Sequence, residues 1–440
     1  MHTNTDSTRR TFLTVCGATT FGMSLRGSVF AQPGVATLPV TGDVNPALEP
    51  FDRLMASFVE EHKVPGAALA VTCKGRLVYA RGFGFADLKT KEPVAPDALF
   101  RIASVSKPIT AVAVMQLVDK GKVSLDDQIA DRMKLKPFVA RGARMDNRWE
   151  QITVRQCLQH TGGFDRDKSF DPIGRPWEIA QTLGIKPPVT PNHIVRYMMG
   201  QPLDFEPGER FAYSNLGYLI LGRIIEAVTG QKYESYVKNE VLGPLGIETM
   251  QLGRARSNQQ AKGEVRYYDA QNRRSPALYP PKVREQVPLQ YGGENFEAFE
   301  AHGGWIASAV DLVKFAAAFD DPSQCPILSA KSIEEMWARP DGAAGKELDG
   351  KPKDAFYGCG WLVRPIGGTQ KSNTWHTGMI AGTEALLVRR WDGLNWSVLF
   401  NTQNSPTGNM LSGLIDGRLH EAADKVKAWP DIDQFNTNFK

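Results

Sequence analysis

Two side chains in the segment Ser104-Val105-Ser106-Lys107 are spaced so that they could perform nucleophilic catalysis together. On a helix, residues three apart share a face, and their Cβ atoms lie about 5–6 Å from each other. The Lys107 amine can therefore reach the Ser104 hydroxyl. If burial and neighbouring positive charge lower the lysine pKa, the amine can take the serine proton as a general base. The pair is a candidate for an activated serine nucleophile.

The context of this pair matters, because Ser235-Tyr236-Val237-Lys238 has the same spacing. Ser104 precedes a strongly apolar segment, residues 107–121, that is predicted to be a helix. Pro108 fits near a helix start, and a helix N-terminus stabilises developing negative charge. Ser235 lies instead on a segment that reads as an ordinary amphipathic helix. The context favours Ser104.

Tyr213-Ser214-Asn215 is the only Tyr-x-Asn segment in the chain. A phenol such as Tyr213 can relay a proton where nearby cations stabilise its anion. The Asn215 amide can both donate to a substrate carbonyl and hold Lys107. The alternative is a loop tyrosine followed by an asparagine that caps the helix predicted over residues 216–228.

A third segment, Trp375-His376-Thr377-Gly378-Met379, precedes the strand patterns near the end of the chain. Gly378 would allow a substrate to approach the backbone closely. The main-chain amide of Met379, at a strand edge, could stabilise an oxyanion together with the amide of Ser104. A second His-Thr-Gly begins at His160, so the tripeptide alone is not diagnostic; we expect His160 to make a structural hydrogen bond in a loop.

The elements that must position these residues predict an α+β fold, because strand patterns occur at both ends of the chain and helical patterns in the middle. The expected strands cover residues 67–73, 76–82, 358–363, 384–390 and 395–400, and terminal helices are expected around 51–59 and 411–422. One antiparallel sheet could combine strands from both ends, with the terminal helices packed on it. A mainly helical lobe, roughly residues 125–300, would be inserted between the strands. A cleft between the lobes would be a natural ligand site.

Together the three segments resemble the serine β-lactamase and penicillin-binding-protein superfamily. The resemblance is to the branch with class C β-lactamases, D-alanyl-D-alanine carboxypeptidases and family VIII carboxylesterases, and further segments such as Gly303-Gly304-Trp305 support it. It implies one β-lactamase/transpeptidase-like domain over residues 47–430. It also implies an acylated nucleophile at Ser104, proton transfer by Lys107 and Tyr213, substrate binding by Asn215, His376, Thr377 and Gly378, and an oxyanion hole formed by the backbone amides of Ser104 and Met379.

The sequence departs from class C β-lactamases at His376, where those enzymes usually have lysine. A histidine is only partly charged near neutral pH, so it is a poor replacement for a fixed cation that binds a β-lactam carboxylate. Peptidase and esterase relatives commonly have histidine there. The resemblance therefore predicts a hydrolase that cleaves ester or peptide bonds through an acyl-enzyme, similar to carboxylesterases or D-amino-acid peptidases. The alternatives are a β-lactamase and a non-catalytic relative that binds penicillin or peptidoglycan.

Composition excludes several other classes of protein. The 440 residues contain 52 Lys plus Arg and 48 Asp plus Glu, an excess too weak for a nucleic-acid partner. The sequence has no uninterrupted apolar run of about 18 residues, so a membrane span is not expected. A stable lipid anchor at Cys16 is not expected either, because Val15 is too large for the position before the cysteine and too little apolar sequence precedes it. We expect no metal or organic cofactor. The expected substrates are small-molecule esters, peptides or β-lactams. Four cysteines after the N-terminal region are expected to be free thiols, although one or two disulfides are an alternative (Cys73, Cys157, Cys325 and Cys359).

The N-terminal region resembles a twin-arginine (Tat) export signal. Arg9-Arg10 precedes a mildly apolar stretch, and small residues end at Ala31, where cleavage is expected. Residues 32–46 then read as a Pro- and Gly-rich linker. The prediction is a periplasmic or secreted protein; the alternative is a tail that carries two arginines by chance.

The segment between Phe164 and Pro191 is long, charged and rich in proline, and it contains Trp177. Long loops either have a function or are tolerated insertions. This one could cover the cleft and select the acyl group, or it could be a solvated insertion.

Overall fold

The computed structural model describes residues 38–142, 144–367, 369, 371–437 and 439. The predicted export signal, residues 1–31, and residues 32–37 of the predicted linker lie outside the described residues. In the rest of that linker, Val40 and Thr41 belong to the sheet, because they pair with Phe83 and Gly82. No helix in the described part of the chain is both long and apolar enough to cross a membrane.

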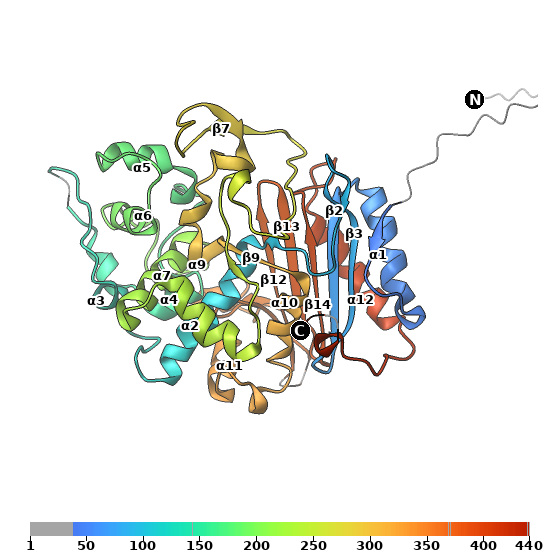
Figure 1. Ribbon diagram of the computed structural model, residues 1–440. Helices are drawn as coiled ribbons and strands as arrows, with labels where there is room; N and C mark the ends of the chain where they lie inside the picture. The colour runs from blue at the N-terminus through green and yellow to red at the C-terminus, as the bar shows by residue number, and fades with distance from the viewer. Residues whose placement is uncertain (1–37, 143, 368, 370, 438, 440) are drawn as a thin grey trace, which may run out of the picture. The chain divides into compact units, whose positions relative to one another are not determined.

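The main sheet is antiparallel and takes its strands from both ends of the chain, as the sequence predicts (Figure 1). The N-terminal strands are β1 (Val40–Thr41), β2 (Gly66–Cys73), β3 (Arg76–Asp87) and β4 (Glu92–Pro93). The C-terminal strands are β10 (Phe356–Tyr357), β11 (Leu362–Pro365), β12 (Ser372–Ile380), β13 (Thr383–Arg389) and β14 (Leu394–Phe400). Their order is β1-β3-β2-β14-β13-β12-β11-β10, and β4 pairs with β3. The two groups of strands meet where β14 pairs with β2.

One expected strand is wrong in detail. Residues 358–363 do not form a single strand; β10 and β11 are separate and pair with each other. Gly360, at φ +85°, lies between them. This left-handed backbone conformation ends the extended run and reverses the chain.

Both faces of the sheet are buried, which explains the unbroken burial of β2 from Gly66 to Cys73. Alternate side chains point to opposite faces of a strand. Leu69 and Val71 join one core with helices α1 (Glu49–Glu61) and α12 (Leu411–Asp424). Ala68 and Ala70 join the other, which contains α2 (Ser106–Asp119) and α10 (Ala309–Ala317). The predicted terminal helices therefore share one face of the sheet (Figure 1).

The middle of the chain is mainly helical, and helix α2 lies within its core. Every residue of α2 from Ser106 to Leu117 is buried, so its apolar character on all sides reflects neighbours in every direction. The other helices are α3 (Ile129–Met133), α4 (Val154–Leu158), α5 (Pro176–Thr182), α6 (Pro191–Met198), α7 (Asn215–Thr229), α8 (Tyr233–Tyr236), α9 (Glu300–Gly303) and α11 (Ala330–Met336). Small sheets join β5 (Phe100–Arg101) to β9 (Trp305–Ala307) and β6 (Gln251–Leu252), and β7 (Arg274–Pro276) to β8 (Gln286–Pro288).

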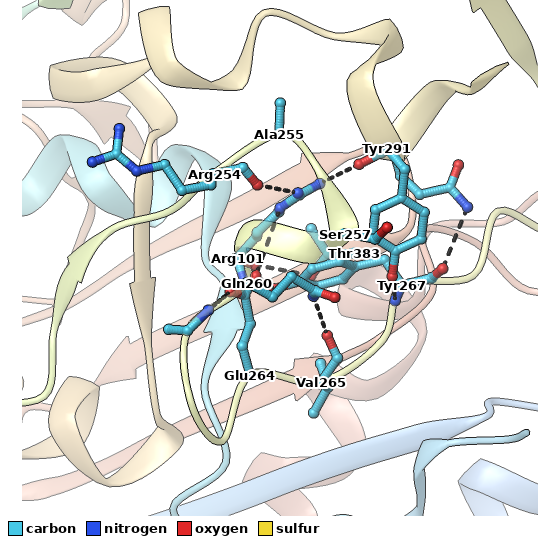
Figure 2. A network of polar contacts seen from close by, with 12 residues as sticks. Arg101, Arg254, Ala255, Ser257, Gln260, Glu264, Val265, Tyr267, Tyr291 and Thr383 are labelled. Carbon is cyan, nitrogen blue, oxygen red and sulfur yellow. Dashed lines mark hydrogen bonds and ion pairs between the residues drawn. The ribbon is translucent and has the colours of Figure 1, made fainter. Parts of the chain in front are cut away.

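A buried arginine fixes the chain just before α2 (Figure 2). The Arg101 guanidinium donates to the carbonyl of Gln290 at 2.8 Å and to that of Arg254 at 2.7 Å. It also lies over the Tyr267 ring, 4.4 Å from the centroid. The Thr383 hydroxyl of β13 donates to the Arg101 carbonyl at 2.9 Å. These contacts hold the backbone that leads into Ser104 against the main sheet.

The cysteines at 73, 157, 325 and 359 are free. Three of them are buried, and Cys325 is half-buried. The expectation of free thiols is therefore confirmed for these four residues.

Candidate active site

Ser104 lies in a short 3₁₀ turn, η2 (Ala103–Val105), that runs directly into α2. The preceding Ala103 has φ +44°, which is rare for a residue with a side chain and is typical of functional sites. The Ile102 amide donates to the carbonyl of Trp305 in β9 at 3.1 Å, which anchors the start of the turn. The half-buried Ser104 side chain is thereby presented to a cleft.

Lys107 is fully buried in the first turn of α2, and its Nζ has three polar neighbours. These are Ser104 Oγ at 3.0 Å, Asn215 Oδ1 at 2.9 Å and the His302 carbonyl at 2.9 Å. The two carbonyl oxygens can only accept hydrogen bonds, whereas a hydroxyl can also donate. A neutral amine has two N–H groups and one lone pair. The two N–H groups suit the carbonyls, so the lone pair is left facing the Ser104 hydroxyl.

The electrostatics of the site favour this neutral amine. Burial lowers the pKa of Lys107 well below its ordinary value, Asp171 opposes the shift, and Arg166 adds to it. The expected condition for a lysine general base, burial with positive charge nearby, is therefore met. By contrast, Ser235 of the second Ser-x-x-Lys segment is exposed and Lys238 is only half-buried.

Tyr213 lies beside Ser104. Its phenol makes a side-chain hydrogen bond with Ser104, and Lys107 Nζ lies 4.8 Å from the ring centroid. Burial raises the pKa of Tyr213 above its ordinary value, and the Ser104 hydrogen bond and Arg166 only partly offset this. The phenol is therefore protonated at rest and can donate a proton, so the phenolate considered from the sequence is not the resting form.

His160 helps to position Tyr213, and its predicted loop hydrogen bond is confirmed. Its Nδ1 accepts from the backbone N–H of Ser214 at 3.1 Å. Its ring packs on that of Tyr213 with centroids 4.4 Å apart. Burial lowers the pKa of His160 well below its ordinary value, so the ring is a neutral support for the tyrosine.

Asn215 is the first residue of α7, and Ser214 holds the N-cap position that was the alternative for it. The Asn215 amide nitrogen donates to Asp171 Oδ2 at 2.6 Å, while its oxygen accepts from Lys107. Asp171 thus fixes which way the amide points. No sequence motif marks Asp171, because it comes from the long segment after Phe164 rather than from a regular element.

The segment His376–Met379 lies on β12, next to the nucleophile turn. Up to Trp375, β12 pairs with both β11 and β13, but from His376 onward it pairs only with β13. From His376 onward, the edge of β12 that faces away from β13 is therefore not paired with β11, and this edge belongs to the site. Met379 is 40% exposed and lines the cleft, whereas Thr377 is half-buried and does not line it. The role of the Met379 amide in an oxyanion hole stays a prediction.

His376 is placed differently from the expectation. It is 2% exposed and is not part of the cleft lining. Its Nε2 lies 2.9 Å from the Tyr357 hydroxyl, and its Nδ1 lies 2.6 Å from the Thr377 carbonyl oxygen. Burial lowers the pKa of His376 to about 3, with Lys107 acting in the same direction. The partial charge expected near neutral pH is therefore wrong, and His376 is a neutral residue behind the site.

Gly378 permits a close approach, but to the protein's own backbone rather than to a substrate. A Cβ at this position would lie 2.0 Å from the Ile102 carbonyl oxygen and 3.0 Å from the Ser104 amide nitrogen. Real Cβ atoms are not found at the first of these distances. The glycine therefore lets β12 lie directly against the turn that carries the nucleophile.

The cleft has a volume of about 470 Å³ and is open to Ser104 and Asn215. The segment after Phe164 forms one wall, which agrees with its predicted role in covering the cleft and not with a solvated insertion (Arg166, Asp171, Ile173, Gly174, Pro176 and Trp177). The lining also includes Arg273, Glu294, Phe299 and His302. Among these residues, only His302 had a sequence signal, since it adjoins Gly303-Gly304-Trp305.

The chain is similar to known proteins over most of its length. The family model described as Beta-lactamase matches residues 51–416. Penicillin-binding protein 4* of Bacillus subtilis (strain 168) is 28% identical over 349 residues, which cover 78% of this chain and 69% of that protein. Protein flp of Staphylococcus aureus (strain N315) is 27% identical over 239 residues, which cover 54% of this chain. The match covers 44% of Protein flp, so this chain spans less than half the length of that relative.

A solved structure has the same fold. The octameric penicillin-binding protein homologue from Pyrococcus abyssi aligns with a TM-score of 0.59 and 26% identity, over 84% of this chain and 76% of that one. The family match extends from α1 to α12 and includes all three motif segments. The chain therefore belongs to the Beta-lactamase family, within the superfamily of serine hydrolases that includes the penicillin-binding proteins.

Proposed function

We propose that this chain is an exported serine hydrolase that cleaves ester or amide bonds through an acyl-enzyme at Ser104. The observation that carries the proposal is the contact of 3.0 Å between Lys107 Nζ and Ser104 Oγ, with the other two Nζ neighbours being carbonyl oxygens. This arrangement supports a lysine that takes the serine proton. The export part of the proposal rests on the sequence of residues 9–31 alone.

In the proposed reaction, Ser104 Oγ bonds to the substrate carbonyl carbon while its proton moves to the Lys107 lone pair. The carbonyl oxygen becomes an oxyanion, which the backbone amides of Ser104 and Met379 would stabilise. Collapse of the tetrahedral intermediate breaks the bond to the leaving group. Tyr213 gives that group its proton and regains one from Lys107. Water then repeats these steps on the acyl ester, which releases the acid and restores Ser104.

Within this reaction class, we propose esters or amides rather than β-lactams as the preferred substrates. His376 is neutral and buried, so it offers no cation for a β-lactam carboxylate. Of the two arginines that line the cleft, Arg273 forms an ion pair with Asp269 at 2.9 Å, and Arg166 lies 3.9 Å from Asp171. Comparing kcat/KM for nitrocefin with that for p-nitrophenyl esters distinguishes the two substrate classes.

Active-site labelling tests the proposed nucleophile. Incubation with a fluorophosphonate and with a fluorescent penicillin, followed by peptide mass spectrometry, is expected to give an adduct on Ser104. Ser104→Ala should abolish the adduct, because no other hydroxyl has a buried lysine as a partner in the described part of the chain. Ser235→Ala is the matched control and should leave labelling unchanged.

Two outcomes of the labelling would contradict the proposal. Labelling that survives Ser104→Ala would place the nucleophile elsewhere. If neither probe forms an adduct on correctly folded protein, the chain is a non-catalytic binding relative.

The pH dependence of hydrolysis is expected to respond in opposite directions to two charge changes near Lys107. Only the neutral amine is a base, so activity falls as the pH drops through the pKa of Lys107. Asp171 raises this pKa and Arg166 lowers it. Asp171→Asn should therefore move the acid limb of kcat/KM to lower pH, and Arg166→Gln should move it to higher pH.

The measurement is the pH profile of kcat/KM with an uncharged ester. Asparagine at position 171 keeps a side-chain oxygen that can accept the hydrogen bond from Asn215, so it changes charge more than geometry. Shifts of the same sign in both variants would refute Lys107 as the group that titrates.

A further inference from the structure

Glu294 is an acidic residue in the cleft that the proposed reaction does not use. It lines the same cavity as Ser104, Asp171 and Met379. Its Oε2 is buried and has no hydrogen-bond partner. A buried polar atom without a partner is costly in a folded protein, so a donor from a ligand that reaches this oxygen would be stabilising.

The groups around Glu294 do not compensate the negative charge of its carboxylate. Arg273 and Arg101 both act on its carboxyl, as does the negative charge of Asp269. However, Arg273 is bound to Asp269, and Arg101 lies 4.0 Å from Glu264. Within the described residues, Glu294 forms no ion pair of its own, because both nearby guanidinium groups lie against other carboxylates.

Asp171, the other acidic residue that lines the cleft, does have partners for its carboxylate. It accepts a hydrogen bond of 2.6 Å from the Asn215 amide, and Arg166 lies 3.9 Å from the same oxygen. Its position is used to hold the catalytic groups. Glu294 is therefore the carboxylate of the cleft that is available to a ligand.

Glu294 is close enough to the reacting bond for one small substrate to reach both. The backbone N–H of Ala381 donates to its carboxyl. Ala381 follows Met379 by two residues, so their Cα atoms lie at most about 7 Å apart. The lining also includes apolar side chains, among them Leu289, Phe299 and Ile380.

We infer that Glu294 binds a protonated amino group of the substrate; this inference rests on the function proposed above. The cleft then selects amino-acid-like esters or amides that have a free amine near the scissile carbonyl and an apolar side chain. An ammonium group supplies both the missing hydrogen-bond donor and the missing positive charge. The apolar lining residues Leu289, Phe299 and Ile380 would contact the side chain of the substrate.

The protonation of Glu294 agrees with such a ligand. Burial raises the pKa of Glu294 to about 7, against the opposing effects of Arg101 and Arg273. The free carboxyl is thus partly neutral near pH 7, and a bound cation would favour its charged form. Preference for an amine should therefore strengthen as the pH rises through about 7, provided that the amine itself stays protonated.

The test compares substrates that differ only in the amine. These are the ethyl esters of D- and L-phenylalanine and ethyl 3-phenylpropanoate, with hydrolysis followed by chromatography of the acids. The wild type should prefer at least one amine-bearing ester. Glu294→Gln should reduce that preference in kcat/KM by about 10- to 100-fold, as expected for the loss of one charge-assisted hydrogen bond, with little effect on ethyl 3-phenylpropanoate.

Glu285→Gln is the matched control, because Glu285 is exposed and precedes the same segment. It should leave the preference unchanged. Equal losses for both kinds of ester in Glu294→Gln, or a wild type that does not prefer the amine, would overturn the inference while leaving the acyl-enzyme proposal intact.

A binding measurement keeps the test independent of catalysis. Calorimetry with Ser104→Ala protein should show tighter binding of one enantiomer of phenylalaninol than of 3-phenylpropanol, and the difference should grow from pH 6 to pH 8. Glu294→Gln in the same background should remove both the difference and its pH dependence. A difference that persists in this double variant would refute a role for Glu294, even if no ester is hydrolysed.

Discussion

Lys107→Met is expected to lower kcat/KM for a p-nitrophenyl ester by about 10³-fold or more, in the range reported for loss of a general base. Methionine has a similar length and suits a fully buried position, so the fold should survive. The change removes the amine whose lone pair faces the Ser104 hydroxyl. It also leaves the oxygens of Asn215 and His302 without the donor that they share.

Two control measurements accompany the assay. Circular dichroism and thermal unfolding should show that Lys107→Met is folded, and fluorophosphonate labelling should slow in parallel with hydrolysis. Lys238→Met, in the second Ser-x-x-Lys segment, should retain activity within about twofold, as for a surface substitution away from special features. Near-normal turnover in a folded Lys107→Met protein would mean that another group takes the serine proton.

Gly378→Ala is expected to damage both stability and activity. The new Cβ would meet the Ile102 carbonyl oxygen at 2.0 Å, so either β12 or the nucleophile turn must move. Overpacking of this kind costs about 1–3 kcal/mol of unfolding free energy. Because a displacement of 1 Å near reacting groups can reduce the rate by about 10²-fold, we expect a loss of that order in kcat/KM.

Urea unfolding and ester hydrolysis measure the two effects. Gly413→Ala is the matched control, since a Cβ there has no atom within 4 Å and lies on helix α12. It should leave activity unchanged and stability equal or slightly increased, because alanine favours a helix more than glycine does. If Gly378→Ala behaves like Gly413→Ala, the close contact between β12 and the turn has no catalytic importance.

The sequence predicts the fold well where side-chain periodicity is strong. The hairpin around Lys74-Gly75 and the strands around Asp392-Gly393 follow from period-two patterns and turn residues. Helix α2 follows from its apolar run. The pattern fails at β10 and β11, because two short strands and the turn at Gly360 contain too few residues to separate one extended run from two.

The candidate site is predictable only in part, for a physical reason. Ser104 and Lys107 are local neighbours, so helical spacing alone places them together. Asp171 and Glu294 come from irregular segments, whose positions depend on tertiary contacts that no periodic pattern records. His376 shows a different limit: residue type indicates which charge is possible, but the burial that lowers its pKa to about 3 depends on the folded surroundings.

The pairing of β14 with β2 also has a consequence for biosynthesis. Ser104 and Lys107 emerge early from the ribosome, whereas β12, which lies against their turn, is made some 270 residues later (372 minus 104 is 268). Until then the chain contains its nucleophile without the strand that completes the site. Contacts between such distant segments are also slow to form. A chain that ends before β12 therefore lacks the strand that lies against the turn of Ser104.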